Sequence, residues 1–294
     1  MYRSLHEAVR DAESQKKSLA QIALEAESRD QGRPISEIRA ALGRALEVMR
    51  GAIAQGLVGN LYSASGLVGG DAAKLRTGPP GPLANTPFRD ILSRALAVQE
   101  VNAAMGVIVA APTAGGAGVL PAVLTGLADA RGIGNEGLVD ALATAGLIGA
   151  VVAERASLSG AEGGCQAETG AAAAMAAGAA TEMLGGNPTQ VVHAVALAQQ
   201  GTLGLVCDPL GGLVELPCVF RNATGAAIAL AAIEMALAGI TFAIPADEVI
   251  DTMGEIGREM DVRYRETAGG GLAATPTGRR LARERLVQIK KAES

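Results

Sequence analysis

Three cysteines, Cys165, Cys207 and Cys218, are the residues of this sequence best suited to reactive chemistry. Cys165 lies in EGGCQAETG, and ten residues separate Cys207 from Cys218 in CDPLGGLVELPC. Glycine or proline lies within two residues of each cysteine, so we expect loops or helix ends from which three thiolates point at one centre. Unpaired cysteines in a reducing compartment serve metal binding or catalysis more often than disulfides.

The spacing of the cysteines is compatible with more than one kind of site. Structural zinc prefers closely paired cysteines and four ligands, whereas this chain offers three widely spaced ones. Thiolates also bind iron–sulfur clusters, and a cluster held by only three cysteines leaves one iron open as a Lewis acid. Two alternatives stay open: a zinc site completed by His193, and free cysteines buried as small hydrophobic side chains.

Charged side chains near the cysteines are candidates for supporting roles. Glu168 follows the first cysteine by three residues, Asp208 directly follows the second, and Arg221 follows the third by three residues. Each of these two carboxylates is a candidate to orient metal ligands or to relay protons. The alternative is a carboxylate at a helix N-terminus, where the helix dipole favours negative charge. Arg221 is a candidate partner for one of them or for a substrate carboxylate; the alternative is a structural ion pair.

Two glycine-rich loops, SGLVGG at 65–70 and AGGAG at 114–118, are candidates to bind a substrate carboxylate through backbone N–H groups. In and beside these loops we expect substrate contacts from Ser63, Ser65, Gly66, Gly69, Thr113 and Gly115, together with Arg221. A helix cap is the alternative role for each hydroxyl.

Lys74 is the one lysine outside the two ends of the chain, so a pyridoxal-phosphate Schiff base is a further alternative. No phosphate-binding loop stands at a recognisable distance from it, and this reading leaves the cysteines unexplained. We therefore expect no pyridoxal phosphate.

Helices must position these groups, because helical signals dominate the sequence and alternating strand patterns are hard to find. Residues 35–50 repeat apolar residues at helical spacing, and Thr86-Pro87 opens a helix that runs to about residue 105. The stretch VIVAA at 107–111 is the only one that resembles a strand, and it follows a helical run. The predicted fold class is all-α.

Three further helices are expected in the second half of the chain. Asn187 and Gln190 form a capping-box pattern, and Gly201 stops the helix that they begin. The alanine-rich segment 171–184 is a strong helix former that glycine closes. Segment 223–240 is apolar on every face, with a single charge, which predicts a buried helix.

Length and composition set the class of protein. The 294 residues are 49 % hydrophobic, which excludes wholesale disorder, and a net charge of −5 with 2 % aromatic residues argues against nucleic-acid binding. Residues 1–50 hold 17 charged side chains and 241–294 hold 18, but 101–240 hold only 13. The middle of the chain is therefore the expected core. The N-terminus lacks an apolar signal-peptide region, so we expect a cytoplasmic protein.

Five long motifs resemble the iron–sulfur-dependent L-serine dehydratase family, specifically its α subunit. They are SGLVGGDAAKL at 65–75, PTAGGAGVLPAVL at 112–124, GCQAETG at 164–170, LGLVCDPLGGLVELPC at 203–218 with Arg221 and Asn222 after it, and YRETAGGGLA at 264–273. They follow the family's order from about residue 50 to 278. We therefore expect a single domain, 1–294, with amphipathic N-terminal helices (1–50), a cluster and substrate core (51–278) and a basic tail (279–294). The tail is either a solvated helix face or a contact with a partner subunit.

The resemblance implies a [4Fe–4S] cluster bound by Cys165, Cys207 and Cys218, the only cysteines present. It also implies conversion of L-serine to pyruvate and ammonia, with the open iron polarising the C–O bond that breaks. In this family, a serine- and histidine-rich loop of a separate β domain contributes to the active site. No such loop occurs here, so the general base is not identified in this chain, and we expect an oligomeric enzyme completed by a β subunit.

Three departures from the family bear on substrate choice. Val68 stands where the family often has threonine, Gly116 where serine or alanine is common, and Arg265 where lysine is common. If positions 68 and 116 supply hydroxyl contacts elsewhere in the family, those contacts are missing here, so preference among serine, threonine and cysteine stays open. The alternatives are a cluster-dependent L-cysteine desulfidase and a non-catalytic redox or metal sensor.

Overall fold

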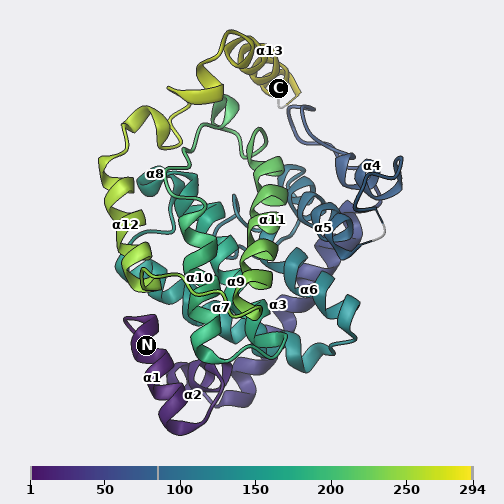
Figure 1. Cartoon of the computed structure of the whole chain (residues 1–294). Coiled ribbons are helices and arrows are strands. Elements are labelled where there is room, and N and C mark those ends of the chain that lie inside the picture. The colour runs from purple at the N-terminus through teal and green to yellow at the C-terminus, as the bar shows by residue number, and fades with distance from the viewer. Residues whose placement is uncertain (1, 85, 293–294) are drawn as a thin grey trace.

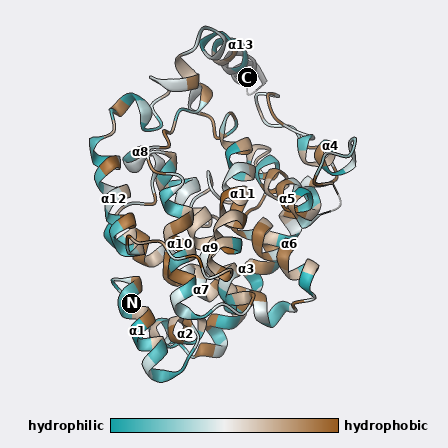
Figure 2. Ribbon diagram, in the orientation of Figure 1, coloured by the Kyte–Doolittle hydropathy of each residue, from teal (hydrophilic) through white to brown (hydrophobic). Residues whose placement is uncertain are grey.

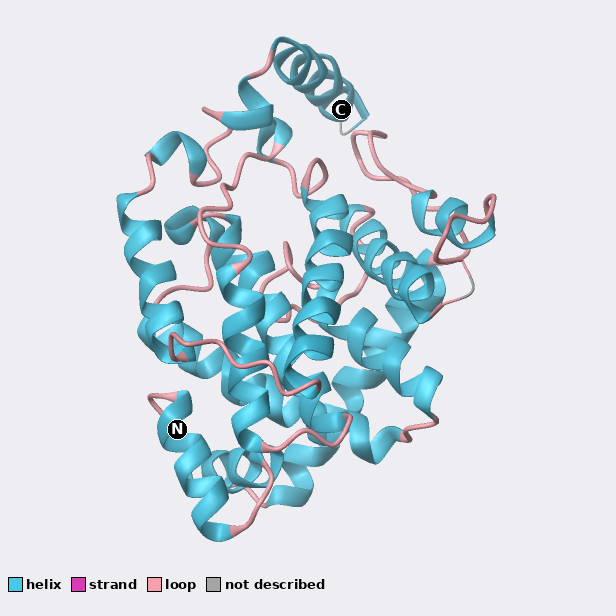
Figure 3. Cartoon of the chain, in the orientation of Figure 1, coloured by secondary structure: helices cyan, strands magenta, loops and turns pink. Residues whose placement is uncertain are grey.

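The chain folds as a bundle of helices (Figure 1). The structure is a computed structural model that describes residues 2–84 and 86–292, with side chains described only to residue 285 in the last helix. No strand occurs among these residues, and loops join the helices (Figure 3). The α-helices are α1 (Leu5–Gln15), α2 (Leu19–Gln31), α3 (Ile35–Gly56), α4 (Asp71–Thr77), α5 (Pro87–Ala103), α6 (Val119–Arg131), α7 (Asn135–Arg155), α8 (Gly160–Gly163), α9 (Ala171–Met183), α10 (Pro188–Gln200), α11 (Cys218–Leu237), α12 (Ala246–Glu259) and α13 (Pro276–Ala292). The all-α prediction is confirmed.

Helix boundaries follow the local signals in the sequence closely. Thr86 and Pro87 begin α5 as predicted, and VIVAA follows that helix as irregular chain. Asn187 accepts the N–H of Gln190 at 2.9 Å, and the Gln190 side chain accepts the N–H of Asn187, so the capping box of α10 is complete.

Helix α9 lies at the centre of the bundle, packed by α6, α7, α10 and α11 (Figure 1). All residues from Ala171 to Thr181 are buried. Small side chains permit this arrangement: a Cβ at Gly178 would overlap Ile148 of α7 and lie 2.9 Å from Val195 of α10. In Figure 2, apolar and neutral residues colour the central helices and hydrophilic ones mark the outer helices. The charge-poor middle of the chain is thus the core.

Carboxylates from the bundle hold the N-termini of three helices. Asp247 of α12 binds the N-terminus of α1, Glu182 of α9 binds that of α2, and Glu100 of α5 binds that of α4. Each accepts the N–H groups of the helix's first two residues, at 2.5–3.2 Å. A helix N-terminus carries unsatisfied N–H groups and partial positive charge, so a buried carboxylate there is well placed.

Helix α11 differs from its prediction. It begins at Cys218 rather than at residue 223, and only one face is buried, with Thr224 and Glu234 exposed. Pro217 at its N-cap position explains the early start, because a proline there loses no helical hydrogen bond. By length and composition alone, α7 and α11 could each cross a membrane, but both pack in the bundle, as core helices do.

The C-terminal segment lies over the cysteine end of the bundle. Helix α13 packs against the turn Leu210–Gly212, between the second and third cysteines. Arg279 and Arg280 near its start are exposed, in keeping with a solvated helix face. Residues 293–294 of the predicted basic tail lie outside the described residues.

Candidate active site

Cys165 is placed by an unusual turn at the N-terminal end of the central helix. It immediately precedes a π-helical turn, Gln166–Gly170, that continues directly into α9. Its sulfur lies 3.1 Å from the Thr169 hydroxyl. Because π-helical turns inside α-helices are rare and occur often at functional sites, this turn marks the position as special.

Cys207 is held by the C-terminal motif YRETAGGG. Its N–H donates to the Tyr264 carbonyl at 2.8 Å, and its own carbonyl accepts the N–H of Glu266 at 2.8 Å. Glu266 has φ = 64°, which is uncommon for a residue with a side chain. The motif therefore fixes the backbone of the second cysteine.

Cys218 is the first residue of α11, and Arg221 lies one turn further on. The Arg221 guanidinium contacts the residues on either side of the second cysteine. Its Nη1 donates to the Val206 carbonyl at 2.8 Å, and its Nη2 lies 2.8 Å from Asp208 Oδ1. The first cysteine is tied to the same loop, because Gln166 N–H donates to the Leu205 carbonyl at 3.0 Å. Three segments that are distant in sequence thus meet around the three cysteines.

The environment of the thiols is dry, and it opposes ionisation. All three cysteines are buried and none forms a disulfide. Burial raises the pKa of each thiol, that of Cys218 to about 12, and Cys165 adds repulsion on the other two. Arg221 works in the opposite direction on Cys165 and Cys218. Redox-sensor cysteines are accessible and readily ionised, so this environment is unlike that of a sensor.

Side chains of the described residues do not form a site for a single metal ion. No group of three or more histidine, cysteine, aspartate or glutamate residues among them is arranged to hold one. A single zinc ion needs its ligands about 2.0 to 2.3 Å from one point. The iron atoms of an iron–sulfur cluster each take their own thiolate, so the thiols that bind a cluster need not meet at one point.

Glu168 places its carboxylate beside the second cysteine. Its Oε1 accepts the Thr113 hydroxyl at 2.8 Å, and its Oε2 lies 4.0 Å from the Cys207 sulfur. A Cβ at Gly115 would lie 2.9 Å from Oε2, and one at Gly160 would lie 2.6 Å from it. The 114–118 loop and the start of α8 therefore need glycine at these positions, because the carboxylate occupies the space. Burial, together with repulsion from Glu266, raises the pKa of Glu168.

The serines of the 63–70 loop face a carboxylate of the protein itself. Ser63 donates to Glu215 Oε2 at 2.7 Å, Ser65 donates to the same oxygen, and Ser65 N–H lies 3.3 Å from Oε1. Both serines and Glu215 are buried. Glu215 therefore occupies the loop's anion-binding position and links it to Cys218, three residues on. In the sequence, the only signal for this role was that Glu215 is the single charged residue between 209 and 220.

The two predicted glycines of this loop have different settings. Gly66 has φ = 69°, faces open space, and donates its N–H to the Ser63 carbonyl at 2.9 Å. Gly69 has φ = 145°, and a Cβ there would lie 2.8 Å from Tyr62. Gly69 thus serves close packing of the loop.

Asn222 joins the other glycine loop to the third cysteine. Its side-chain amide donates to the carbonyls of Gly115 at 2.7 Å and Cys218 at 2.9 Å, and its Oδ1 accepts the Gly118 N–H at 2.9 Å. All three contacts are to the backbone, so sequence spacing alone did not indicate this bridge.

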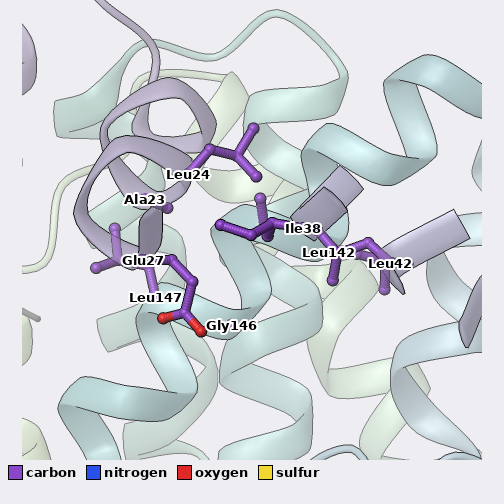
Figure 4. A pocket seen from close by; sticks show the side chains of 9 residues that line it. Ala23, Leu24, Glu27, Ile38, Leu42, Leu142, Gly146 and Leu147 are labelled. Carbon is purple, nitrogen blue, oxygen red and sulfur yellow. The ribbon is translucent and has the colours of Figure 1, made fainter. Parts of the chain in front are cut away.

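The other candidates lie elsewhere. His193 of α10 accepts the Phe242 N–H, and His6 lies in α1, so neither joins the cysteines. Lys74 is exposed and lies 2.9 Å from Asp71. An apolar cavity of about 270 Å³ between α2, α3 and α7 has Glu27 as its one charged residue and is lined by no candidate site residue (Figure 4).

Comparison with known proteins places these features in a family. The family model described as "Serine dehydratase alpha chain" matches residues 14–273. The chain is 53 % identical over 245 residues to the "Probable L-serine dehydratase, alpha chain" of Bacillus subtilis, covering 81 % of this chain and 80 % of that one. It is 40 % identical over 269 residues to the "L-serine dehydratase, alpha chain" of Peptoniphilus asaccharolyticus, covering 90 % and 91 % of the two chains.

A longer relative aligns over only part of its length. The "L-serine dehydratase" of Streptomyces coelicolor is 44 % identical over 245 residues, which are 81 % of this chain but 53 % of that protein. About half of that relative therefore has no counterpart in the aligned region.

Proposed function

Because the chain belongs to the serine dehydratase alpha chain family, we propose that it is the α subunit of an L-serine dehydratase, a lyase. In the reaction, L-serine loses its α-proton and its β-hydroxyl as water. The resulting 2-aminoacrylate tautomerises to the imine, and water hydrolyses the imine to pyruvate and ammonia. The observation that carries the proposal is the gathering of Cys165, Cys207 and Cys218 beside Glu168. The cytoplasm stays the predicted compartment.

Three cysteines of this chain would hold a [4Fe–4S] cluster. The donor set fits the group: three buried thiols free of disulfides, reached from three segments, with no arrangement for a single ion in the described part of the chain. When bound, a cluster with three protein ligands supplies a Lewis acid through its remaining iron. Since burial raises the pKa of the thiols, ligation must release their protons, and the nearby Arg221 guanidinium favours the thiolates of Cys165 and Cys218.

Glu168 and Thr113 would orient the amino acid. Oε1 of Glu168 accepts the Thr113 hydroxyl, whereas Oε2 has, in the described part of the chain, only the Cys207 sulfur at 4.0 Å. An α-ammonium group that enters the site is a strong donor for the under-used oxygen. We therefore propose that Glu168 binds the amino group of the substrate beside Cys207.

A second chain would complete proton transfer. Both histidines of this chain lie away from the cysteines, and a general base must come within hydrogen-bond reach of the α-proton. The relatives named as alpha chains imply a partner for those proteins, and the Streptomyces coelicolor protein carries about as much chain again. We therefore infer a β subunit that supplies the missing group.

Substitution of one ligand tests the function. Cys218→Ser is expected to lower bound iron and sulfide sharply and to abolish pyruvate formation by the anaerobic α–β complex. Thr224→Ser, on an exposed turn of the same helix, is the control and should keep both. Full iron content and turnover in the Cys218 variant would contradict the cluster. Release of hydrogen sulfide from L-cysteine in preference to pyruvate from L-serine would support the desulfidase instead.

A further inference from the structure

A pocket of about 350 Å³ lies between α8, α12 and the π-helical turn that follows Cys165. Helix α8 packs against α12 at this end of the bundle (Figure 1). The charged residues that line the pocket are Arg258 of α12, Arg265 of the C-terminal motif and Glu162 of α8. Small or apolar side chains line another part of it, namely Ala156, Ala161, Ala167 and Met253. The pocket therefore combines basic groups with an apolar wall.

The two arginines of this pocket lack acceptors. Neither guanidinium group forms a hydrogen bond or an ion pair with any residue that the structure describes, and Nε of Arg265 is buried without a partner. The Arg258 guanidinium lies over the pocket lining, because a Cβ at Gly254 would lie 3.2 Å from its Nη1. A buried donor without an acceptor costs free energy. The arrangement favours an anion that accepts hydrogen bonds from both side chains.

The acidic residue of the pocket is held by a neighbour and does not neutralise the arginines. Oε2 of Glu162 accepts the Ser157 hydroxyl at 2.6 Å, and within the described ranges this carboxylate forms no ion pair with either arginine. Two guanidinium groups and one carboxylate give the lining a net charge of +1, which a single negative charge balances. Guanidinium groups bind carboxylates through two parallel hydrogen bonds. The apolar wall suits a short hydrocarbon chain.

We propose that this pocket binds a short-chain monocarboxylate. Its carboxylate lies between Arg258 and Arg265, and its carbon chain lies toward Ala161 and Ala167. The inference goes beyond the proposed function, because no residue of the pocket is assigned to the cluster or to L-serine.

The pocket adjoins the backbone that carries two of the cysteines. Ala167 follows Cys165 by two residues in the π-helical turn. Arg265 belongs to the segment 264–266, whose backbone hydrogen-bonds to Cys207. A carboxylate that both arginines hold therefore links this segment to α12 and restricts local opening of the chain beside the cysteines.

Titration of the purified full chain with pyruvate, followed by calorimetry, tests the site. Arg258→Gln and Arg265→Gln each remove a charged donor, so we expect the dissociation constant to rise roughly 10- to 100-fold. Arg265→Lys keeps the charge but lacks the Nε–H donor, so its affinity should lie between those of the wild type and Arg265→Gln. Arg279→Gln, at an exposed position of α13, is the control and should change the affinity less than twofold. Circular dichroism checks that each variant folds.

Hydrogen exchange of the same samples locates the bound carboxylate. Pyruvate should slow amide exchange in residues 163–167 and 264–266 of the wild-type chain, and it should have no such effect in Arg258→Gln. Slowed exchange elsewhere, with these two segments unchanged, would overturn the location.

Further outcomes would also overturn the site. They are the absence of saturable pyruvate binding to the wild-type chain, unchanged affinity in both glutamine variants, and equal weakening by Arg279→Gln, which would indicate non-specific attraction to positive charge. Inorganic phosphate is titrated as the comparison of higher charge, and tighter binding of phosphate than of pyruvate would overturn the monocarboxylate.

A variant at the cysteines separates this site from the proposed function, in which pyruvate is the product. Cys218→Ser should leave the affinity for pyruvate unchanged, whereas loss of binding would place pyruvate at the cysteines and overturn the pocket. If the wild-type α–β complex does not turn over L-serine but pyruvate still binds through both arginines, the proposed function fails and the carboxylate site stands.

Discussion

The two ends of the central helix bear half-buried glutamates with different roles. Glu182 at the C-terminal end accepts the first two N–H groups of α2 and the Thr144 hydroxyl. Glu168, in the π-helical turn at the other end, accepts the Thr113 hydroxyl and lies 4.0 Å from the Cys207 sulfur. Burial raises the pKa of both carboxylates. Both oxygens of Glu182 accept hydrogen bonds, whereas Oε2 of Glu168 has only the 4.0 Å contact with the Cys207 sulfur among the described residues.

Truncation of Glu182 should give the largest effect, and on stability alone. Glu182→Ala leaves two helix N–H groups and a buried hydroxyl without their acceptor, so a loss of about 3 kcal/mol in unfolding free energy is expected. Denaturant unfolding measures it. Turnover by the folded complex should stay near that of the wild type, and a large fall in turnover with intact stability would contradict the division between the two ends.

Neutralising Glu168 should have the reverse pattern. Glu168→Gln keeps the side-chain volume but removes the charge that faces the substrate ammonium, and a hydrogen bond to a charged group contributes about 1.5–3 kcal/mol. We expect kcat/KM for L-serine to fall roughly 10- to 100-fold. Stability and iron content should change little.

Glu162→Gln is the matched control for that measurement. Glu162 is exposed and accepts only the Ser157 hydroxyl among the described contacts. Its kinetics should be those of the wild type. If the Glu168 variant has the same kcat/KM as the wild type, Glu168 does not bind the substrate.

The serines of the 63–70 loop test whether this loop belongs to the fold or to the substrate. Ser63→Ala removes one donor to Glu215, so a loss of about 1 kcal/mol in unfolding free energy is expected. KM for L-serine should change less than twofold. A tenfold rise in KM at unchanged stability would instead support direct substrate binding, as the sequence pattern predicts.

The smallest expected effect is a pH dependence of stability that comes from Glu182. Because burial raises the pKa of Glu182 in the folded state, its contribution to stability is present below the ordinary glutamate pKa and is lost as pH rises through the raised value. Glu182→Gln does not titrate, so wild-type stability should decline relative to this variant across that window. A difference that is constant with pH would show that burial does not perturb this carboxylate.

Local signals predicted the helices well but predicted contacts across the bundle poorly. The capping box at Asn187 and the proline at 87 act within four residues, so the sequence displays them directly. Glu215 meets the 63–70 loop across about 150 residues, and no spacing rule reports such a pair. Glu182 at the start of α2 is another contact of this kind.

The cysteines were singled out by residue type, whereas their surroundings depend on the three-dimensional fold. The 114–118 loop was expected to present N–H groups to a substrate, but a carboxylate of the chain fills the space beside Gly115. Asn222 and Gly160 were not assigned site roles, because their contacts depend on segments that are remote in sequence. Glu168 drew attention only through its distance of three residues from Cys165.

The pairing of Cys207 with residues 264–266 sets an order of events during synthesis. The backbone of this cysteine is fixed by Tyr264 and Glu266, which leave the ribosome more than fifty residues after it. Helices α1 to α12 have been synthesised by then, so the backbone of this cysteine is fixed late in synthesis. Insertion of the proposed iron–sulfur cluster is therefore expected only after residue 266 has been translated.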